Sequence, residues 1–280
     1  MSTLSLAGTL KVTARWAFGG LHDLQVDLKR PPVARALVGL TPGEALARLP
    51  VYFNLCSQAQ TEAGRLALAA AGMPLGTPVE SWRLWAECLH EHLWRLLLDW
   101  PRVMGAVPET AAFAAWRACR AQGREALADA TRELLEHRVL AGPLGGLLAR
   151  LEVRLHVGQG DDPVGAGLEA RVQAIRDACA ALAANRDYPR GSLGGEAGGR
   201  AEGWVHTARG ALHHRLRLAG GRVADWEIDA PTDRNFADAI ALRRRLPEHL
   251  PDPREAKAAL ERAVLLLDPC VPYGVEIDHA

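Results

Sequence analysis

The feature that most constrains the fold of this chain is a long amphipathic stretch between Pro78 and Trp100. Its apolar residues recur every three or four positions, as they do on one face of an α-helix: Trp82, Trp85, Leu89, Leu93, Leu96 and Leu97. A helix with so wide an apolar face is stable in water only when other elements cover that face. The pattern therefore predicts a buried helix in a mostly helical protein, and we interpret the stripe as core rather than as a cofactor-binding surface.

Short motifs indicate where other helices begin. Residues 41–44 and 77–80 both read Thr-Pro-x-Glu, which provides a capping hydroxyl, a proline at the first helical position and a glutamate that can complete a capping box. These motifs predict one helix from 42 to about 49, ended by Pro50, and another from 78 to 100. Apolar spacing predicts further helices at 58–71, 109–140, 143–155, 168–184, 236–246 and 253–267.

Two other segments alternate apolar and polar residues, which is typical of strands with one buried face. Each segment is interrupted by a Gly-Gly pair, so residues 4–28 and 212–228 each predict an antiparallel hairpin. A glycine-rich stretch at 190–199 lacks the lysine and the strand-loop-helix context of a phosphate-binding loop, and we interpret it as a flexible connector. The expected fold class is α+β: a mostly helical core with two small antiparallel hairpins, in a single domain over residues 1–280.

Composition and charge exclude several classes of function. The 280 residues include 33 basic and 33 acidic side chains, so the chain has no overall positive field to attract nucleic acid or an anionic membrane. No apolar run is long enough to span a bilayer, and no basic-then-apolar signal segment opens the chain. Five cysteines form an odd and sparse set, which favours reduced thiols over a disulfide framework. We therefore expect a cytoplasmic protein with no nucleic-acid or membrane partner.

The cysteines fall into two groups. Three lie inside apolar helical patterns and are expected to be ordinary buried residues: Cys88, Cys119 and Cys179. The other two lie far apart in distinctive contexts, Cys56 in Asn-Leu-Cys-Ser-Gln-Ala and Cys270 in Asp-Pro-Cys-Val-Pro-Tyr. Cys56 is predicted at or just before a helix N-terminus, where the helix dipole would lower the pKa of its thiol.

These two segments resemble the cysteine-bearing ends of a [NiFe]-hydrogenase large subunit. In that family a Cys-x-x-Cys near the start and an Asp-Pro-Cys-x-x-Cys near the end supply four thiolates to nickel and iron. In this chain Ala59 and Tyr273 stand at the positions of the second cysteines. Three further segments match the family in the same order: 6–12 resembles its opening strand, 207–212 its Ala-Pro-Arg-Gly-Ala-Leu motif, and 231–236 its Pro-Thr-Thr-Trp-Asn motif.

The departures from the family pattern argue against hydrogen turnover. The second cysteines bridge the two metals in the family, so their absence predicts that no intact nickel–iron centre forms. Ala7 stands where the family carries a glutamate associated with proton transfer. Glu276 stands where the family carries the histidine that marks its processing site. We therefore expect that the protein is not an enzyme.

The whole pattern resembles the HupK/HoxV type of hydrogenase-maturation protein, which is similar to a truncated large subunit. The resemblance implies a reduced large-subunit-like fold and an accessory role, as a scaffold that transiently holds an iron fragment carrying cyanide and carbonyl. Cys56 and Cys270 are then the expected metal ligands, because soft sulfur suits such iron. Arg209 corresponds to the guanidinium that overhangs the iron's diatomic ligands and is the expected cofactor-binding residue. The implied partners are the small maturation chaperone and the hydrogenase large subunit.

Two alternatives belong to other classes of function. A metal-free interaction protein would mimic the large subunit and hold maturation partners through its surface alone. An enzyme would need a catalytic or zinc cluster, for which the candidates are His213 and His214 beside Arg209, or Glu87, His90, Glu91 and His92. His90 and His92 are two positions apart and point to different helix faces, unlike the i, i+4 pair of a metalloprotease helix. We interpret these histidines as solvated or core-edge residues.

Overall fold

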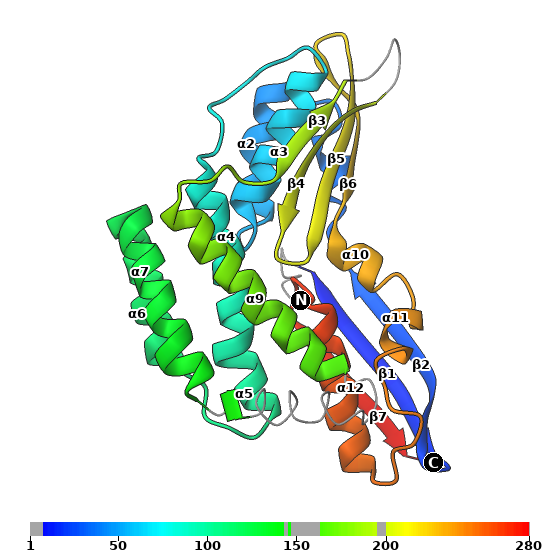
Figure 1. The fold of residues 1–280 in the computed structure, drawn as a ribbon. Helices are drawn as coiled ribbons and strands as arrows, with labels where there is room; N and C mark the ends of the chain where they lie inside the picture. Colours follow the sequence, from blue (N-terminus) through cyan, green and yellow to red (C-terminus); the bar gives the residue numbers. More distant parts are fainter. Residues whose placement is uncertain (1–7, 143–144, 147–162, 195–199, 280) are drawn as a thin grey trace.

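The computed structural model describes residues 8–142, 145–146, 163–194 and 200–279, and it contains two sheets joined by helices (Figure 1). One sheet has the strand order β2-β1-β7 and the other the order β3-β4-β5-β6. The structure is thus mixed α+β, as predicted. Ala7 and most of the helix predicted at 143–155 lie outside the described residues.

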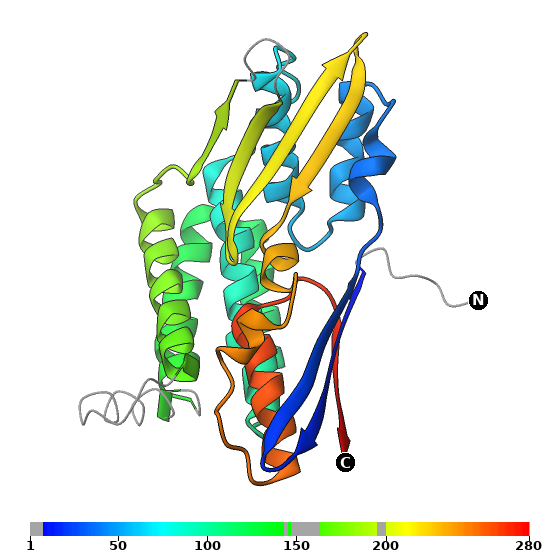
Figure 2. The same cartoon turned by 90° about the vertical axis from the view of Figure 1, so that its right-hand side faces the viewer.

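The three-stranded sheet joins the two ends of the chain. β1 (Thr9–Ala17) and β2 (Gly20–Lys29) form the first predicted hairpin. β7 (Tyr273–His279) runs parallel to β1, and Figure 2 shows the two strands side by side. The sequence prediction ended the regular structure with a helix at 267, so this third strand corrects it. Helix α12 (Pro253–Leu267) covers the sheet through a shared apolar core with β1.

The four-stranded sheet is antiparallel and contains the second predicted hairpin, formed by β5 (Gly210–Ala219) and β6 (Arg222–Asp229). β4 (Ala201–Thr207) and β3 (Arg190–Leu193) extend it. The interpretation of 190–199 as a flexible connector is therefore wrong for its first four residues, which pair with β4. Residues 195–199 lie outside the described residues.

Helices fill the remainder of the described chain. Their bounds are α1 (Val33–Leu37), α2 (Pro42–Tyr52), α3 (Ser57–Ala70), α4 (Ser81–Trp94), α5 (Trp100–Val103), α6 (Thr110–Cys119), α7 (Arg124–Leu134), α9 (Pro163–Ala183), α10 (Pro231–Asn235) and α11 (Ile240–Arg243). A π-helical stretch at 95–99 joins α4 to α5. Within the described residues, no helix is both long and apolar enough to cross a membrane.

The apolar stripe between Trp82 and Leu97 lies in the centre of the protein. Leu89, Leu93 and Leu96 are fully buried, and their core cluster includes Leu168 and Ile175 of α9. α6 and α7 lie on the outer side of these two helices (Figure 1). The predicted helical core is confirmed for this part of the chain.

Only one of the two predicted capping boxes forms. At Thr41 both hydrogen bonds of the box are present, and α2 continues past Pro50 for two residues, further than predicted. The motif at Thr77 does not cap a helix, and α4 begins three residues later than that motif predicts. The backbone of Val79 is bound elsewhere: its N–H donates to Glu62 at 3.0 Å and its carbonyl accepts from Arg190 at 2.6 Å.

Two predicted helices are shorter than the periodicity suggested. The region 109–140 is divided at Gly123, whose φ of 99° is incompatible with a continuous helix. The region 236–246 holds only the four-residue α11. There the side chain of Asp238 accepts a hydrogen bond from the Ile240 N–H at 2.8 Å. This local bond favours a turn at 238–240, so the helix does not extend back to 236.

Candidate metal-binding pocket

Cys270 lies in the short loop between α12 and β7, and other elements fix this loop on both sides. Its backbone N–H donates to the Thr232 hydroxyl at 3.2 Å, and the Pro272 carbonyl accepts from Leu10 at 2.9 Å. Asp268 begins the loop in the left-handed region, with φ 54°. The conformation of this loop is therefore fixed by its contacts with α10 and β1.

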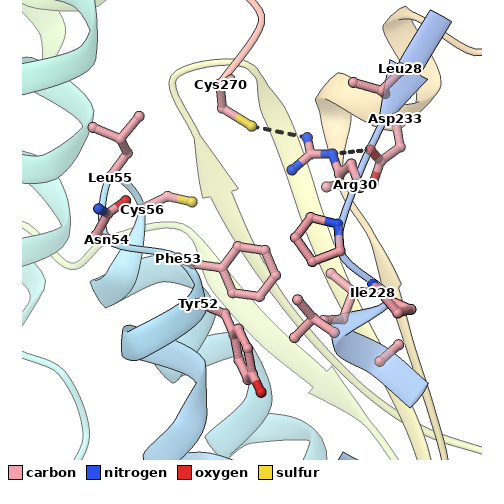
Figure 3. A pocket seen from close by; sticks show the side chains of 15 residues that line it. Leu28, Arg30, Tyr52, Phe53, Asn54, Leu55, Cys56, Ile228, Asp233 and Cys270 are labelled. Atoms are coloured by element: carbon pink, nitrogen blue, oxygen red, sulfur yellow. Dashed lines mark hydrogen bonds and ion pairs between the residues drawn. The ribbon is translucent and has the colours of Figure 1, made fainter. Parts of the chain in front are cut away.

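Cys56 lies at the N-cap of α3, where the sequence predicted it. Both Cys56 and Cys270 are half-buried and both line the same cavity of about 290 Å³. Figure 3 shows the two sulfur atoms on facing sides of this cavity. The fold thus brings together two thiols that lie more than two hundred positions apart.

The pocket combines one polar end with apolar walls. The apolar part is formed mainly by the end of α2 and the segment after β2, including Pro31, Val33, Tyr52 and Phe53. The polar end consists of the two thiols, Arg30 and Asp233. Small-molecule pockets measure roughly 300–1,000 Å³, so this cavity suits a small fragment rather than a dinucleotide or another large cofactor.

Two donors converge on the sulfur of Cys270. Arg30 donates from Nη2 at 3.0 Å, and the Thr232 hydroxyl donates at 3.1 Å. Arg30 also lies 2.6 Å from a carboxylate oxygen of Asp233 through Nε. The guanidinium and the hydroxyl therefore both use the Cys270 sulfur as a hydrogen-bond acceptor.

The expected helix-dipole effect on Cys56 is wrong. Removal from water raises the pKa of the Cys56 thiol, and the proximity of Cys270 and Glu87 raises it further. The buried Glu87 carboxylate occupies the first turn of α3, accepting from the N–H of Gln58 at 2.7 Å and of Ala59 at 2.9 Å. The first N–H groups of α3 are therefore already bound by Glu87 rather than directed at Cys56.

Arg209 lies in the turn between β4 and β5, and its side chain is buried against two acids. Its Nε donates to the main-chain carbonyl of Asp268 at 2.7 Å, and its Nη2 donates to Glu91. Burial opposes its charge, but Asp268 and Glu91 outweigh that effect and raise the pKa of Arg209. Arg209 is not among the residues that line the cysteine pocket. Its assignment as a cofactor-binding residue remains a prediction.

Asp268 is the centre of a buried ion-pair cluster beside the pocket. Arg95 lies 2.6 Å from one of its carboxylate oxygens and Arg171 lies 2.9 Å from the other. Burial would raise the pKa of Asp268, but Arg209, Arg171 and Arg95 together hold that pKa well below its usual range. Since Asp268 precedes Cys270 by two positions, this cluster fixes the position of the cysteine loop.

Comparisons with known proteins identify the family of this chain. It is 31% identical to the hydrogenase expression/formation protein HupV of Azotobacter chroococcum mcd 1, across 98% of the chain and all of the relative. It is 32% identical to the protein HupK of Azotobacter vinelandii, over the same shares. The protein HoxV of Cupriavidus necator is 26% identical across 89% of this chain and 91% of its own length. No protein-family model matches the sequence.

The chain belongs to the HupK/HupV/HoxV family of hydrogenase expression/formation proteins. Its role therefore lies in hydrogenase maturation, and the names of these relatives describe formation of a hydrogenase rather than a catalysed reaction.

In this HupK/HupV/HoxV family member, the two residues at the positions of the second cysteines lie outside the lining of the pocket. Ala59 is buried in the first turn of α3, and Tyr273 begins β7. Neither residue lines the cysteine pocket, but Tyr273 lines a separate cavity that shares Cys270 and Leu55 with it. Within the described residues, no group of three or more His, Cys, Asp or Glu side chains could hold a metal.

Three of the four histidines of the enzyme alternative are in the core, whereas the fourth, His213, is half-buried on β5 and lies 2.6 Å from Glu202. His90, His92 and His214 are buried. His92 accepts from Arg171 at 3.4 Å, and His214 contacts Gln60 and Trp226. These contacts place the three residues in the core rather than in solvent or in a cluster facing a cavity.

The other cysteines have local partners. Cys179 donates to the Ala128 carbonyl at 3.2 Å and Cys119 to the Ala115 carbonyl at 3.5 Å. Cys88 is buried beside Tyr188 in an apolar cluster. Cys88 and Cys179 are buried as expected, whereas Cys119 is only half-buried.

Sequence reasoning missed Arg30 and Thr232. Thr232 belongs to the family-like segment 231–236 but has no motif role there, and Arg30 stands in a segment with no recognised motif. Its importance arises because β2 ends beside the loop of Cys270, and that proximity depends on the pairing of β1 with β7.

Proposed function

We propose that this protein is a scaffold in [NiFe]-hydrogenase maturation that transiently holds an iron fragment carrying cyanide and carbonyl ligands. The observation that carries the proposal is the pair of thiols, Cys56 and Cys270, on facing sides of one small pocket (Figure 3). Sulfur ligands suit soft, low-valent or strongly ligated iron better than hard cations. The fragment is cargo in this proposal, and the protein keeps no metal of its own.

Two protein ligands are appropriate for a temporary site. An iron atom bound by two thiolates retains only two bonds to the protein, and its remaining positions are filled by its own diatomic ligands. The family's four-thiolate arrangement would add bridging ligands, which Ala59 and Tyr273 do not supply. Transfer to an acceptor that offers more thiolates would therefore be favourable.

The surroundings of the thiols support binding of an anionic group. Arg30 provides a positive charge inside the pocket and Arg209 provides one behind the loop. The positive charge of Arg209 lowers the pKa of Cys56, against the larger effect of burial. Apolar walls and partial burial lower the local dielectric, so each of these interactions is stronger than in bulk solvent.

The proposed partners follow from the same role. The small maturation chaperone would deliver the iron fragment, and the hydrogenase large subunit would receive it. We further propose that the fold is a reduced form of the large subunit, because the pairing of both chain ends brings the two cysteine segments together. A large-subunit-like surface would let the same partners bind both proteins.

An infrared spectrum of protein isolated without oxygen tests the proposal, because cyanide and carbonyl absorb where protein does not. The wild type should show these bands together with bound iron, and Cys56→Ser and Cys270→Ser should show neither. Cys119→Ser is the matched control, since it changes a half-buried thiol outside the pocket. Wild-type protein that captures maturation partners but shows no bands would favour the metal-free interaction protein instead.

A further inference from the structure

Arg30 is the charged side chain that enters the cysteine pocket from the end of β2. It is 20% exposed, and it lines the pocket together with Cys56 and Cys270. Its Nη2 donates to the Cys270 sulfur at 3.0 Å, and its Nε lies 2.6 Å from Asp233. Asp233 is therefore an ion-pair partner of the guanidinium, and Cys270 accepts a hydrogen bond from one of its terminal nitrogens.

The same guanidinium has donors left for a ligand. Arginine carries five N–H groups on three nitrogens, and the described residues provide no acceptor for Nη1. Figure 3 shows the third nitrogen of Arg30 turned toward the space between the two cysteine side chains and Phe53. A ligand held by both sulfurs would lie within that space.

Arg209 differs from Arg30 in this respect. Its Nε and Nη2 are already occupied by Asp268 and Glu91, and it lies outside the pocket lining. Arg209 can contribute charge to the pocket from behind the cysteine loop, but Arg30 is the guanidinium with free donors inside it.

We propose that Arg30 is the residue that recognises the anionic diatomic ligands of the cargo, by donating hydrogen bonds from its unoccupied N–H groups while its Nη2 holds the Cys270 sulfur. This inference rests on the proposed function and specifies its ligand contact. Bound cyanide carries negative charge and a nitrogen that accepts hydrogen bonds, and a guanidinium is a suitable charge-assisted donor for it. Phe53 on the apolar side of the pocket offers no hydrogen bond. The neutral carbonyl is therefore the ligand that faces Phe53 in this proposal.

The experiment compares two iron probes of opposite charge under anaerobic conditions. One probe is Fe²⁺ alone, and the other is a synthetic iron(II) complex with two cyanides, carbonyls and a net negative charge. Binding of each probe is measured for the wild type, Arg30→Leu, Arg30→Lys and the control Arg35→Leu. Arg35 is an exposed residue of α1 outside the pocket, so its removal makes the same change in net charge.

The two probes should respond in opposite directions. Loss of a charge-assisted hydrogen bond should weaken binding of the anionic complex to Arg30→Leu by roughly tenfold or more. Binding of Fe²⁺ should stay equal or become tighter, because a nearby positive charge has been removed. Arg30→Lys should retain part of the affinity for the complex but shift its cyanide infrared bands. Arg35→Leu should match the wild type with both probes.

Three results would overturn the inference. Equal weakening of both probes in Arg30→Leu would indicate a purely structural role, with the scaffold function intact. Wild-type affinity of Arg30→Leu for the anionic complex would exclude Arg30 as its contact. Failure of the wild type to bind either probe would reject the proposed function and this inference with it. If Arg30→Leu does not fold, the cyanide-band shift in Arg30→Lys decides the question.

Discussion

The Nε of Arg209 donates a hydrogen bond to the main-chain carbonyl of Asp268 at 2.7 Å, across 59 positions of sequence. This bond ties the β4–β5 turn to the loop that carries Cys270. Through the same side chain the turn is also tied to Glu91 of α4. The geometry makes Arg209 a residue that positions one of the two candidate ligands.

Arg209→Leu is therefore expected to destabilise the fold. Among the described residues it would leave Glu91 with His90 as its one basic partner, and it would remove one of three arginines from Asp268. Loss of one member of a buried ion pair costs about 3–5 kcal/mol. Arg209→Lys keeps the charge without the planar fork and should cost less. Urea unfolding measures both, with the exposed Arg217→Leu on β5 as control.

The result separates two roles for Arg209. If Arg209→Leu unfolds like the wild type but retains no iron fragment, the residue acts on the cargo, as the family resemblance implies. If it is destabilised and Arg209→Lys retains the fragment, the residue acts by holding the cysteine loop in place.

Replacement of the pocket cysteines should affect metal retention and spare the fold. Serine is nearly isosteric with cysteine but a poor ligand for soft iron, so Cys56→Ser and Cys270→Ser should lose bound iron and hydrogenase maturation. Both side chains are half-buried at a cavity, so their thermal unfolding should change little. Cys119→Ser and Cys179→Ser should support maturation. Equal behaviour of all four variants in a maturation assay would contradict a special role for the pocket pair.

The contact between α3 and β4 provides a test of the fold that is independent of metal. A Cβ at Gly203 would lie 2.2 Å from the Ala63 carbonyl oxygen and 2.4 Å from the Ala67 nitrogen. Because both are backbone atoms, Gly203→Ala must separate the helix from the sheet, and it should cost about 1–3 kcal/mol as an overpacking change.

Gly43→Ala is the matched control for this prediction. Gly43 lies in the first turn of α2, and a Cβ there would have no neighbour within 4 Å. Alanine has the higher helix propensity, so this variant should be neutral or more stable by up to about 1 kcal/mol. Guanidinium unfolding of both variants checks the pair, and similar stabilities would contradict the close packing of α3 on β4.

The parts of the fold that could be predicted from the sequence are those set by local chemistry. The stripe through Leu89 and Leu93 requires burial whatever surrounds it, and the box at Thr41 closes within four residues. The box at Thr77 fails because Glu62 and Arg190, from distant elements, bind the backbone of Val79. No local pattern contains those partners.

In the candidate site, too, some residues can be predicted from local sequence and others depend on long-range pairing. Cys56 and Cys270 could be selected from sequence because their segments resemble a known ligand frame. β7 has the alternation of a strand, with Glu276 and Asp278 exposed on one face, but its pairing with β1 depends on the rest of the fold. Arg30 could not be selected, because its place beside Cys270 follows from that long-range pairing.

Buried His214 is expected to make the protein less stable in mild acid. Its Nε2 lies 2.7 Å from the Gln60 amide oxygen, and Trp226 donates to its Nδ1 at 3.1 Å. A neutral ring with its proton on Nε2 satisfies both contacts, whereas a second proton on Nδ1 would face the Trp226 N–H. Burial lowers the pKa of His214 to about 3, with a smaller contribution from His213.

The sign of the effect follows from the two pKa values. Unfolded histidine has a pKa of about 6.5, so between about pH 6.5 and pH 3 the unfolded state binds more protons than the folded state. Stability from His214 is present above pH 6.5 and is lost as pH falls toward 3. Between pH 7 and pH 5.5, this group alone should lower the free energy of unfolding by about 1 kcal/mol.

Urea unfolding of the wild type and His214→Gln at the two pH values isolates the contribution of His214 to the free energy of unfolding. His92, whose pKa burial and Arg171 lower to about 3, contributes with the same sign. Glu87, whose pKa burial raises to about 7, contributes with the opposite sign. Both are present in each protein and cancel in the comparison. The wild type should lose about 1 kcal/mol more than the variant on acidification, and equal losses would mean that His214 is protonated as readily in the folded protein as in the unfolded chain.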